Sequence, residues 1–69
     1  MKHSEIKVGQ KFLDITCERV DTIVKITKKG FSYTYVHGKG DAAKIMKTNI
    51  YYKRFLKDFE SGDYIQINK

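Results

Sequence analysis

Cysteine and long apolar stretches are scarce in this chain of 69 residues. Cys17 is the only cysteine, so no internal disulfide can form and no cysteine pair is present to hold zinc. A single thiol is typical of a reducing compartment, and we expect a cytoplasmic location. No apolar run approaches the roughly 18 residues of a membrane-spanning helix, and no signal-peptide pattern begins the chain. The sequence therefore predicts neither secretion nor insertion into a membrane.

Arginine is also scarce, whereas lysine is abundant. Lysine and arginine together number fourteen against eight aspartate and glutamate residues, which gives a net charge of +6, and twelve of the fourteen are lysines. The isoelectric point of about 9.5 is typical of a nucleic-acid-binding protein. Lysine contacts phosphate as a point charge, whereas the arginine fork reads guanine edges. The composition predicts contacts to the nucleic-acid backbone more than to bases. A lysine-rich surface that only maintains solubility is the alternative.

The length allows one domain, residues 1–69, with a small core. A chain of this size buries only roughly 60% of the surface that it exposes when unfolded. Its net stability without disulfides or metals is on the order of 3–5 kcal/mol. The core of such a domain is therefore marginal.

One segment has the spacing of an amphipathic helix. Tyr52, Phe55, Leu56 and Phe59 recur at i, i+3, i+4 and i+7, which predicts a helix over about residues 49–60. Thr48 or Asn49 is expected to cap its start. Gly62 is expected to end it in a left-handed conformation. Arg54 and Asp58 lie four residues apart on its solvent face.

The remaining segments alternate as strands do. Residues 11–17 alternate as a half-buried strand, with Leu13, Ile15 and Cys17 on one side and Cys17 as a small core residue. Residues 20–28, 31–37, 44–48 and 63–68 are the other expected strands, the last with Ile65 and Ile67 pointing inward. The sequence predicts a mainly β fold with one helix before the last strand, either a small SH3-like barrel or a strongly curved antiparallel sheet.

The orientation of three aromatic residues depends on the hairpin at Gly30, where glycine is expected to supply a positive φ. A two-residue loop, Lys29-Gly30, places Ile26 opposite Tyr33 and Val24 opposite Tyr35, and the aromatic residues then join the core. A three-residue loop that starts at Lys28 shifts the pairing by one residue, so the aromatic residues would lie on the other face of the sheet.

The three-residue loop exposes Phe31, Tyr33 and Tyr35 as a strip suited to stacking bases, at roughly 1–3 kcal/mol each. Turn chemistry favours this loop, because lysine is a poor first residue of a two-residue hairpin. The need to fill a small core favours the buried arrangement, in which the hydroxyl groups of Tyr33 and Tyr35 reach solvent at the edge of the core. We take the buried arrangement as the prediction.

No catalytic or ligand-binding motif is present. Asp58, Glu60 and Asp63 straddle the helix end and a turn, where acidic residues are usually solvated. His37 ends a strand beside a glycine and is expected to be a surface residue. Residues 38–40 lack the third glycine that dinucleotide binding needs. The sequence therefore predicts no enzyme, no cofactor, no metal site and no small-molecule substrate.

The best candidate surface is basic. Its lysines come from the hairpin near Gly30, from the glycine-rich loop near residue 39, and from the helix, where Lys53 and Lys57 are four residues apart. Whether they form one patch is open at this stage. The candidate nucleic-acid-binding residues are Lys25, Lys28, Lys29, Tyr33, Tyr35, Lys39, Lys44, Lys47, Lys53, Arg54 and Lys57.

The order of elements resembles that of SH3-like small barrels. The pattern Val8-Gly9-x-x-Phe12-x-Asp14, then Val24-x-Ile26, Phe31-x-Tyr33 and Phe55-Leu56-x-x-Phe59-Glu60, is similar to that of short uncharacterised phage and prophage proteins. The resemblance implies a fold and an origin in a mobile element, and it carries over no functional residue.

Two kinds of partner follow from these observations. The first is nucleic acid, bound mainly through phosphates. The second is an acidic protein, such as a host protein met by a phage-encoded modulator, bound at an edge strand or a groove. A homo-oligomer formed through an edge strand is a third arrangement.

Overall fold

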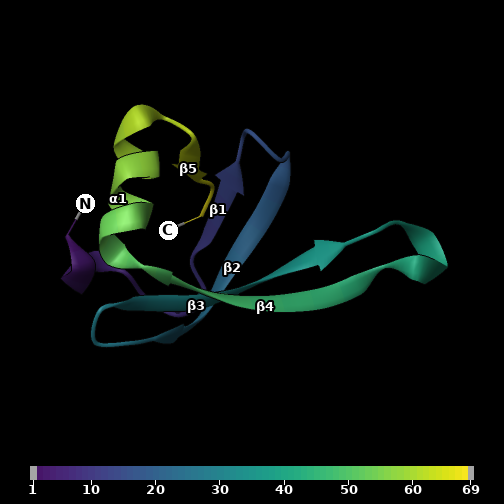
Figure 1. Ribbon diagram of the computed structural model, residues 1–69, viewed down its shortest axis with the longest axis horizontal. Coiled ribbons are helices and arrows are strands. Elements are labelled where there is room, and N and C mark those ends of the chain that lie inside the picture. The colour runs from purple at the N-terminus through teal and green to yellow at the C-terminus, as the bar shows by residue number, and fades with distance from the viewer. Residues whose placement is uncertain (1, 69) are drawn as a thin grey trace.

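Five antiparallel strands form one curved sheet in the computed structural model, which describes residues 2–68 (Figure 1). In chain order the elements are η1 (His3–Glu5), β1 (Lys11–Asp14), β2 (Arg19–Ile26), β3 (Gly30–His37), η2 (Gly40–Ala42), β4 (Lys44–Tyr51), α1 (Tyr52–Ser61) and β5 (Tyr64–Gln66). The strand order β4-β3-β2-β1-β5 places β4 and β5 at the two edges, and α1 connects them. The predicted mainly β fold with one helix before the last strand is confirmed.

The helix follows β4 without an intervening loop. Its Ncap residue is Tyr51, whose side chain makes no capping hydrogen bond, so the expected cap at Thr48 or Asn49 is wrong. Those residues belong instead to β4, which extends well beyond the expected strand 44–48. The predicted end is confirmed: Gly62 is left-handed at φ 89°, and the Asp63 N–H reaches the Asp58 carbonyl at 2.9 Å.

Aromatic rings fill the space between α1 and the inner face of the sheet. Phe55, 1% exposed, packs edge-on against Phe12 and Phe31, with ring centroids 5.1 Å apart in both pairs. Tyr64 from β5 lies 5.8 Å from the same ring, and Ile23 from β2 is fully buried. The helical spacing noted in the sequence thus places one ring at the centre of the core.

On β1, β5 and the first part of β2, the inner face consists of the residues that alternate with the expected ones. Five residues predicted to face the core are exposed: Cys17, Val24, Ile26, Ile65 and Ile67. In their place the sheet buries Phe12, Ile23 and Tyr64. Both sides of these strands carry apolar residues, so a period of two identifies a strand without identifying its inner side.

The β2–β3 hairpin has a two-residue loop, Lys28-Lys29, one position earlier than expected. Ile26 lies opposite Phe31, and beyond a bulge at Val24 the partner of Tyr33 is Ile23. Both predicted sets of partners are therefore wrong. The predicted burial is confirmed for Phe31 and Tyr33. The unpaired residue of the bulge brings Ile23 to the side that Tyr33 occupies.

Gly30 is required for close approach rather than for a positive φ. Its φ is not positive, contrary to the expectation. A Cβ atom there would lie 1.9 Å from the carbonyl oxygen of Ile50 in β4. Only glycine lets the start of β3 pass this close to the end of β4.

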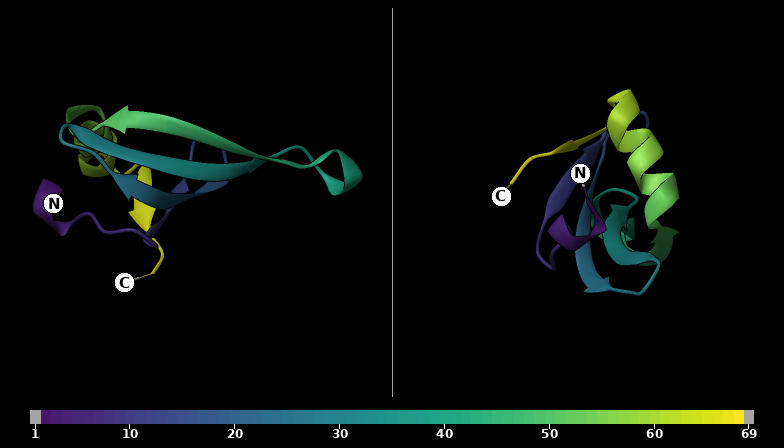
Figure 2. Two further views of the ribbon diagram at one scale, coloured as in Figure 1. Left: turned by 90° about the horizontal axis from the view of Figure 1, so that it is seen from below. Right: turned by 90° about the vertical axis from the view of Figure 1, so that its left-hand side faces the viewer.

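The distal parts of β3 and β4 form an arm, residues 35–46, that extends away from the helix (Figure 2). The strands remain paired from Tyr35 with Met46 to His37 with Lys44, and η2 forms the tip. From Val36 to Met46 every residue is exposed, because α1 covers only the other end of the sheet. The arm adds surface without adding core.

Candidate nucleic-acid interface

The predicted basic residues fall into three groups in space. Lys28, Lys29 and Lys53 come together at one end of the molecule, which we call the basic end. Lys25 and Lys47 lie on the outer face of the sheet, the face turned away from α1. Lys39 and Lys44 lie on the arm. The candidates therefore do not form one patch.

The basic end is built where the β2–β3 loop meets the start of α1. The backbone N–H of Tyr52 donates to the Lys29 carbonyl at 2.8 Å, which fixes the loop against the helix. The imidazole Nε2–H of His3 donates to the Gly30 carbonyl at 3.1 Å, and its ring lies 5.3 Å from that of Tyr52. These contacts hold segments from three parts of the chain beside one another.

A hollow of about 430 Å³ lies among these segments. It is lined by His3, Lys28, Lys29, Tyr51, Tyr52 and Lys53. No acidic side chain is in this lining, and the Tyr51 side chain is 70% exposed. The hollow can therefore accept an anionic group beside a planar one.

The helix extends the basic end along its exposed side. Lys53 and Lys57 are both exposed and four residues apart, so they lie on one side of α1. Arg54 is exposed and forms the predicted pair with Asp58, with Nε and Oδ2 3.9 Å apart. Positive charge in a first helical turn opposes the helix dipole, so stability alone does not favour lysine at position 53.

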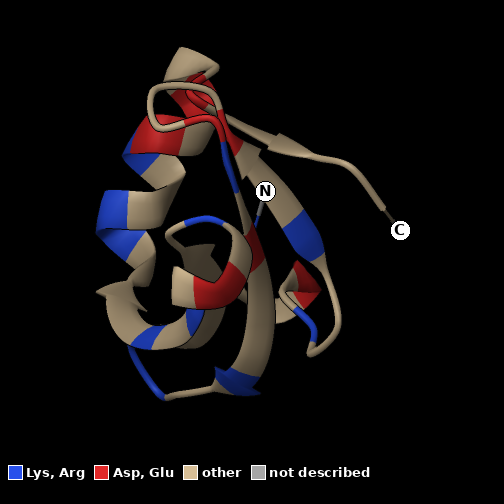
Figure 3. Cartoon of the chain, turned by 90° about the vertical axis from the view of Figure 1, so that its right-hand side faces the viewer, with Lys and Arg blue, Asp and Glu red and all other residues tan. Residues whose placement is uncertain are grey.

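Acidic residues gather at the opposite end of the helix (Figure 3). Asp58, Glu60 and Asp63 surround its last turn, and the Ile15 N–H donates to the Asp63 carbonyl at 3.0 Å. This bond brings in the β1–β2 turn, which contributes Asp14 and Glu18. The net charge of the protein is thus distributed unevenly: five acidic residues lie at this end of the helix, whereas Glu5 in η1 is the acidic residue next to the N-terminal segment of the basic end.

The two tyrosines among the candidates are not open stacking surfaces. Tyr33 is 8% exposed and belongs to the core, so its inclusion as a surface-binding residue is wrong. Tyr35 is half-buried, and the guanidinium carbon of Arg19 lies 4.0 Å from the centre of its ring. This cation–π contact occupies one face of the ring.

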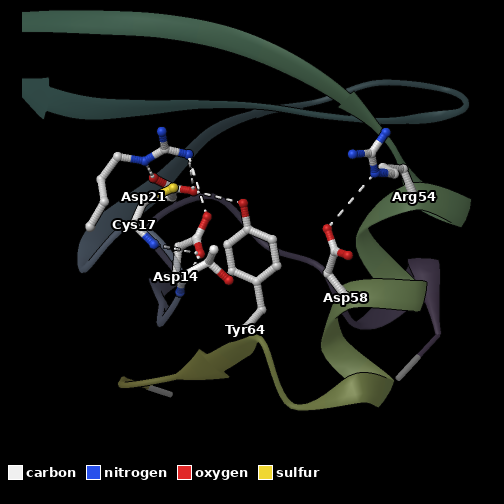
Figure 4. A network of polar contacts seen from close by, with 8 residues as sticks. Asp14, Cys17, Asp21, Arg54, Asp58 and Tyr64 are labelled. Atoms are coloured by element: carbon white, nitrogen blue, oxygen red, sulfur yellow. Dashed lines mark hydrogen bonds and ion pairs between the residues drawn. The ribbon is translucent and has the colours of Figure 1, made fainter.

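A buried carboxylate organises the polar residues near Tyr35 (Figure 4). Asp21 is 3% exposed and accepts hydrogen bonds from Arg19 at 2.7 and 3.2 Å and from the Tyr64 hydroxyl at 3.1 Å. The hydrogen bond that Arg19 donates to Asp21 raises the pKa of Arg19. Burial, followed by the Asp21 charge, raises the pKa of Tyr64 and that of Tyr33. The carboxylate is paired on several sides, so these contacts hold β1, β2 and β5 together.

This network and several basic-end residues were missed from the sequence. Arg19 and Asp21 are two residues apart on one strand, which places them on the same side and could have signalled the pair. His3, Tyr51 and Tyr52 at the basic end have no such local signal. Their proximity depends on how the N-terminal segment folds over the hairpin.

Other kinds of site find no support in the part of the chain that the structure describes. Within residues 2–68, no three His, Cys, Asp or Glu side chains are grouped as metal ligands would be. No helix in this range is long and apolar enough to cross a membrane. His37 is exposed, as expected, and Cys17 is exposed rather than in the core.

Comparison of the chain with protein-family models, curated proteins and solved structures gave no significant match in any of the three. The resemblance to phage proteins and the SH3-like name therefore stay predictions. Function has to be argued from the surfaces of the molecule itself.

Proposed function

We propose that this protein is a non-enzymatic module that binds nucleic acid through backbone phosphates at the basic end. The observation that carries the proposal is the meeting of Lys28, Lys29 and Lys53 around one hollow with no acidic residue in its lining. Lysine ammonium groups neutralise phosphates without reading sequence, so binding is expected to be weakly specific.

The aromatic residues at this end suit a flexible strand. Tyr51 is exposed beside the lysines, and a base can stack on an exposed ring whatever its identity. Lys57 continues the positive charge along α1, where the next phosphate of a bound strand would lie. Single-stranded DNA or RNA is therefore the expected preferred form.

Fluorescence anisotropy with labelled single- and double-stranded DNA and RNA at two salt concentrations tests the proposal. Three phosphate contacts predict that log affinity falls with log salt concentration with a slope of about −2 for a single strand. The triple variant K28E/K29E/K53E should abolish the binding. The control K39E/K44E/K47E makes the same change in net charge on the arm and the outer face, away from the basic end, and should retain most of the binding.

Two results would reject this function. Binding that is absent even at low salt would exclude nucleic acid as a ligand. An equal loss in the two triple variants would show that net charge, and not the basic end, governs the interaction. Replacement of Tyr51 by serine then reports on stacking, with an expected loss of about tenfold in affinity for single strands.

A further inference from the structure

The outer face of the sheet carries a row of apolar side chains that, within residues 2–68, is exposed to solvent except at the half-buried Leu13. Ile65 on β5 is paired with Leu13 on β1, and Leu13 with Val20 on β2. On the other two strands Val36 is paired with Ile45, and these side chains are 60% and 77% exposed. Paired residues share a face, so this apolar row runs along the outer face in two segments, one on β5, β1 and β2 and the other on β3 and β4.

A hollow interrupts the apolar row at its middle. The β2–β3 ladder ends at Thr22 and Thr34, and beyond it Val20 and Val36 line a hollow of about 700 Å³. An apolar side chain from a partner can enter between the strands there. Soluble proteins rarely expose an apolar strip of this extent unless something binds it.

A second row, two residues further along each strand, is polar and basic. Lys11 is paired with Thr22, Thr22 with Thr34, and Thr34 with Lys47. Lys25 is the other charged side chain on this face, and the face carries no aspartate or glutamate within the five described strands. The strands of the outer face therefore present apolar groups beside positive charge, while Glu18 of the β1–β2 turn lies in the lining of the hollow together with Arg19.

We infer that the outer face of the sheet docks an acidic amphipathic helix of a partner protein. The apolar row spans two strand spacings, about 10 Å, from β5 to β2 and one spacing, about 5 Å, from β3 to β4, with the hollow between the two segments. A helix of about 13 residues is about 19 Å long, which is more than the two segments together. Its apolar stripe would lie on the row, and acidic residues on one flank would meet Lys11 and Lys47, about 7 Å away along the strands.

Charge decides between this occupant and a second copy of the chain. Two outer faces packed against each other would bring lysines together with no carboxylate on the strands of either face, and Glu18 at the hollow already lies beside Arg19, which disfavours self-association. Nucleic acid satisfies the lysines but leaves Val36 and Ile45 exposed. A helix that is apolar on one side and acidic beside it satisfies both rows.

The test uses a synthetic helical peptide of about 14 residues as probe, with leucines at i, i+3, i+4 and i+7 and glutamates along one flank. A matched peptide carries lysines in place of the glutamates. We expect the glutamate peptide to bind with a Kd below about 100 μM and the lysine peptide at least about tenfold more weakly. Anisotropy or titration calorimetry measures both.

Variants locate the binding. V36T/I45T removes apolar groups from exposed positions and should weaken the glutamate peptide about tenfold, as should the charge reversal K11E/K47E. Val8→Thr, an exposed apolar residue outside the row, is the control and should change nothing. K28E/K29E/K53E should also bind the peptide normally, because docking at the outer face does not depend on the nucleic-acid function proposed above.

Four outcomes would overturn the inference. The first is equal binding of the two peptides, and the second is no binding at about 1 mM peptide. The third is a dimer in sedimentation that V36T/I45T abolishes, which would identify a second copy as the occupant. The fourth is nucleic-acid binding that K11E/K47E removes and K28E/K29E/K53E leaves intact.

Discussion

The two faces of the sheet differ in what covers them, although both are apolar. The inner face packs Phe12, Phe31 and Tyr64 against Phe55 of α1 and buries the Asp21 carboxylate in hydrogen bonds. The outer face leaves Val36 and Ile45 in solvent. Stability is therefore concentrated on one face, and the other face is available for interaction.

This difference shows why apolar content does not identify a core. A strand with apolar residues at successive positions can bury either side, and the side that meets a helix becomes the core. Here the larger, aromatic side chains face α1, and the smaller, branched ones remain outside. Aromatic side chains bury the largest apolar area per residue, so placing them against α1 gives the inner face most of the stabilisation.

The largest expected loss of stability is at Phe55, which packs against the inner face of the sheet. Replacing it with alanine should cost about 3–5 kcal/mol of unfolding free energy, which is comparable to the whole stability of a domain of this size. The variant should be largely unfolded at 25 °C by far-UV circular dichroism. Retention of a cooperative urea transition near that of the parent would contradict the core described above.

The second expected effect is at Asp21. Replacing it with asparagine removes the charge that pairs with Arg19 and should cost about 3 kcal/mol of unfolding free energy, read from the midpoint of urea denaturation. Asp41→Asn on the exposed tip of the arm is the matched control and should leave the midpoint unchanged. Similar midpoints for both variants would mean that the buried network contributes nothing to stability.

A smaller effect, dependent on pH, is expected at Tyr64. Its pKa is raised in the folded protein, whereas in the unfolded chain a tyrosine releases its proton near pH 10. Above about pH 10 the unfolded state therefore binds fewer protons than the folded state, and the unfolding free energy falls as pH rises. Below that pH the contribution of Tyr64 is fully present.

Urea denaturation between about pH 9 and about pH 11 measures this dependence. Tyr64→Phe should lower stability by about 1–2 kcal/mol at neutral pH, because the hydroxyl no longer donates to Asp21, and should reduce the alkaline loss. Tyr51→Phe, at an exposed tyrosine, should behave like the parent at every pH. A parent whose stability does not change over this range would contradict the assignment.

The smallest expected effect on folding is on the outer face. Ile45→Thr should change the unfolding free energy by less than about 0.5 kcal/mol, because this side chain is already in solvent. The same substitution contributes to the loss of peptide binding predicted above. A loss of stability as large as that of Asp21→Asn would show that the outer face belongs to the core after all.

Much of the fold was predictable because its signals are local. The spacing of Tyr52, Phe55 and Phe59 identified the helix, and Gly62 marked its end. The bounds at the start of the helix were wrong, because the Ncap residue Tyr51 makes no capping hydrogen bond through its side chain and β4 continues directly into α1. The inner side of each strand was wrong wherever both sides were apolar.

The candidate site was less predictable, since charge counts do not give positions. The lysines of the hairpin loop were correctly taken as neighbours of one another. Their approach to Lys53 depends on the bond between the Tyr52 N–H and the Lys29 carbonyl, which joins residues far apart in the chain. Lys11 was overlooked as a binding residue, because only the register places it in a row with Lys47.

The sequence by itself determined the class of the fold, the position of the helix and the excess of lysine, because these depend on local periodicity and composition. The tertiary structure alone decided which side of the sheet is the core and which lysines lie together. The physical reason is that the pairing of the strands decides which side of each strand faces the helix. A single unpaired residue at Val24 changes the partners along β2 and β3, and no local sequence pattern indicates it.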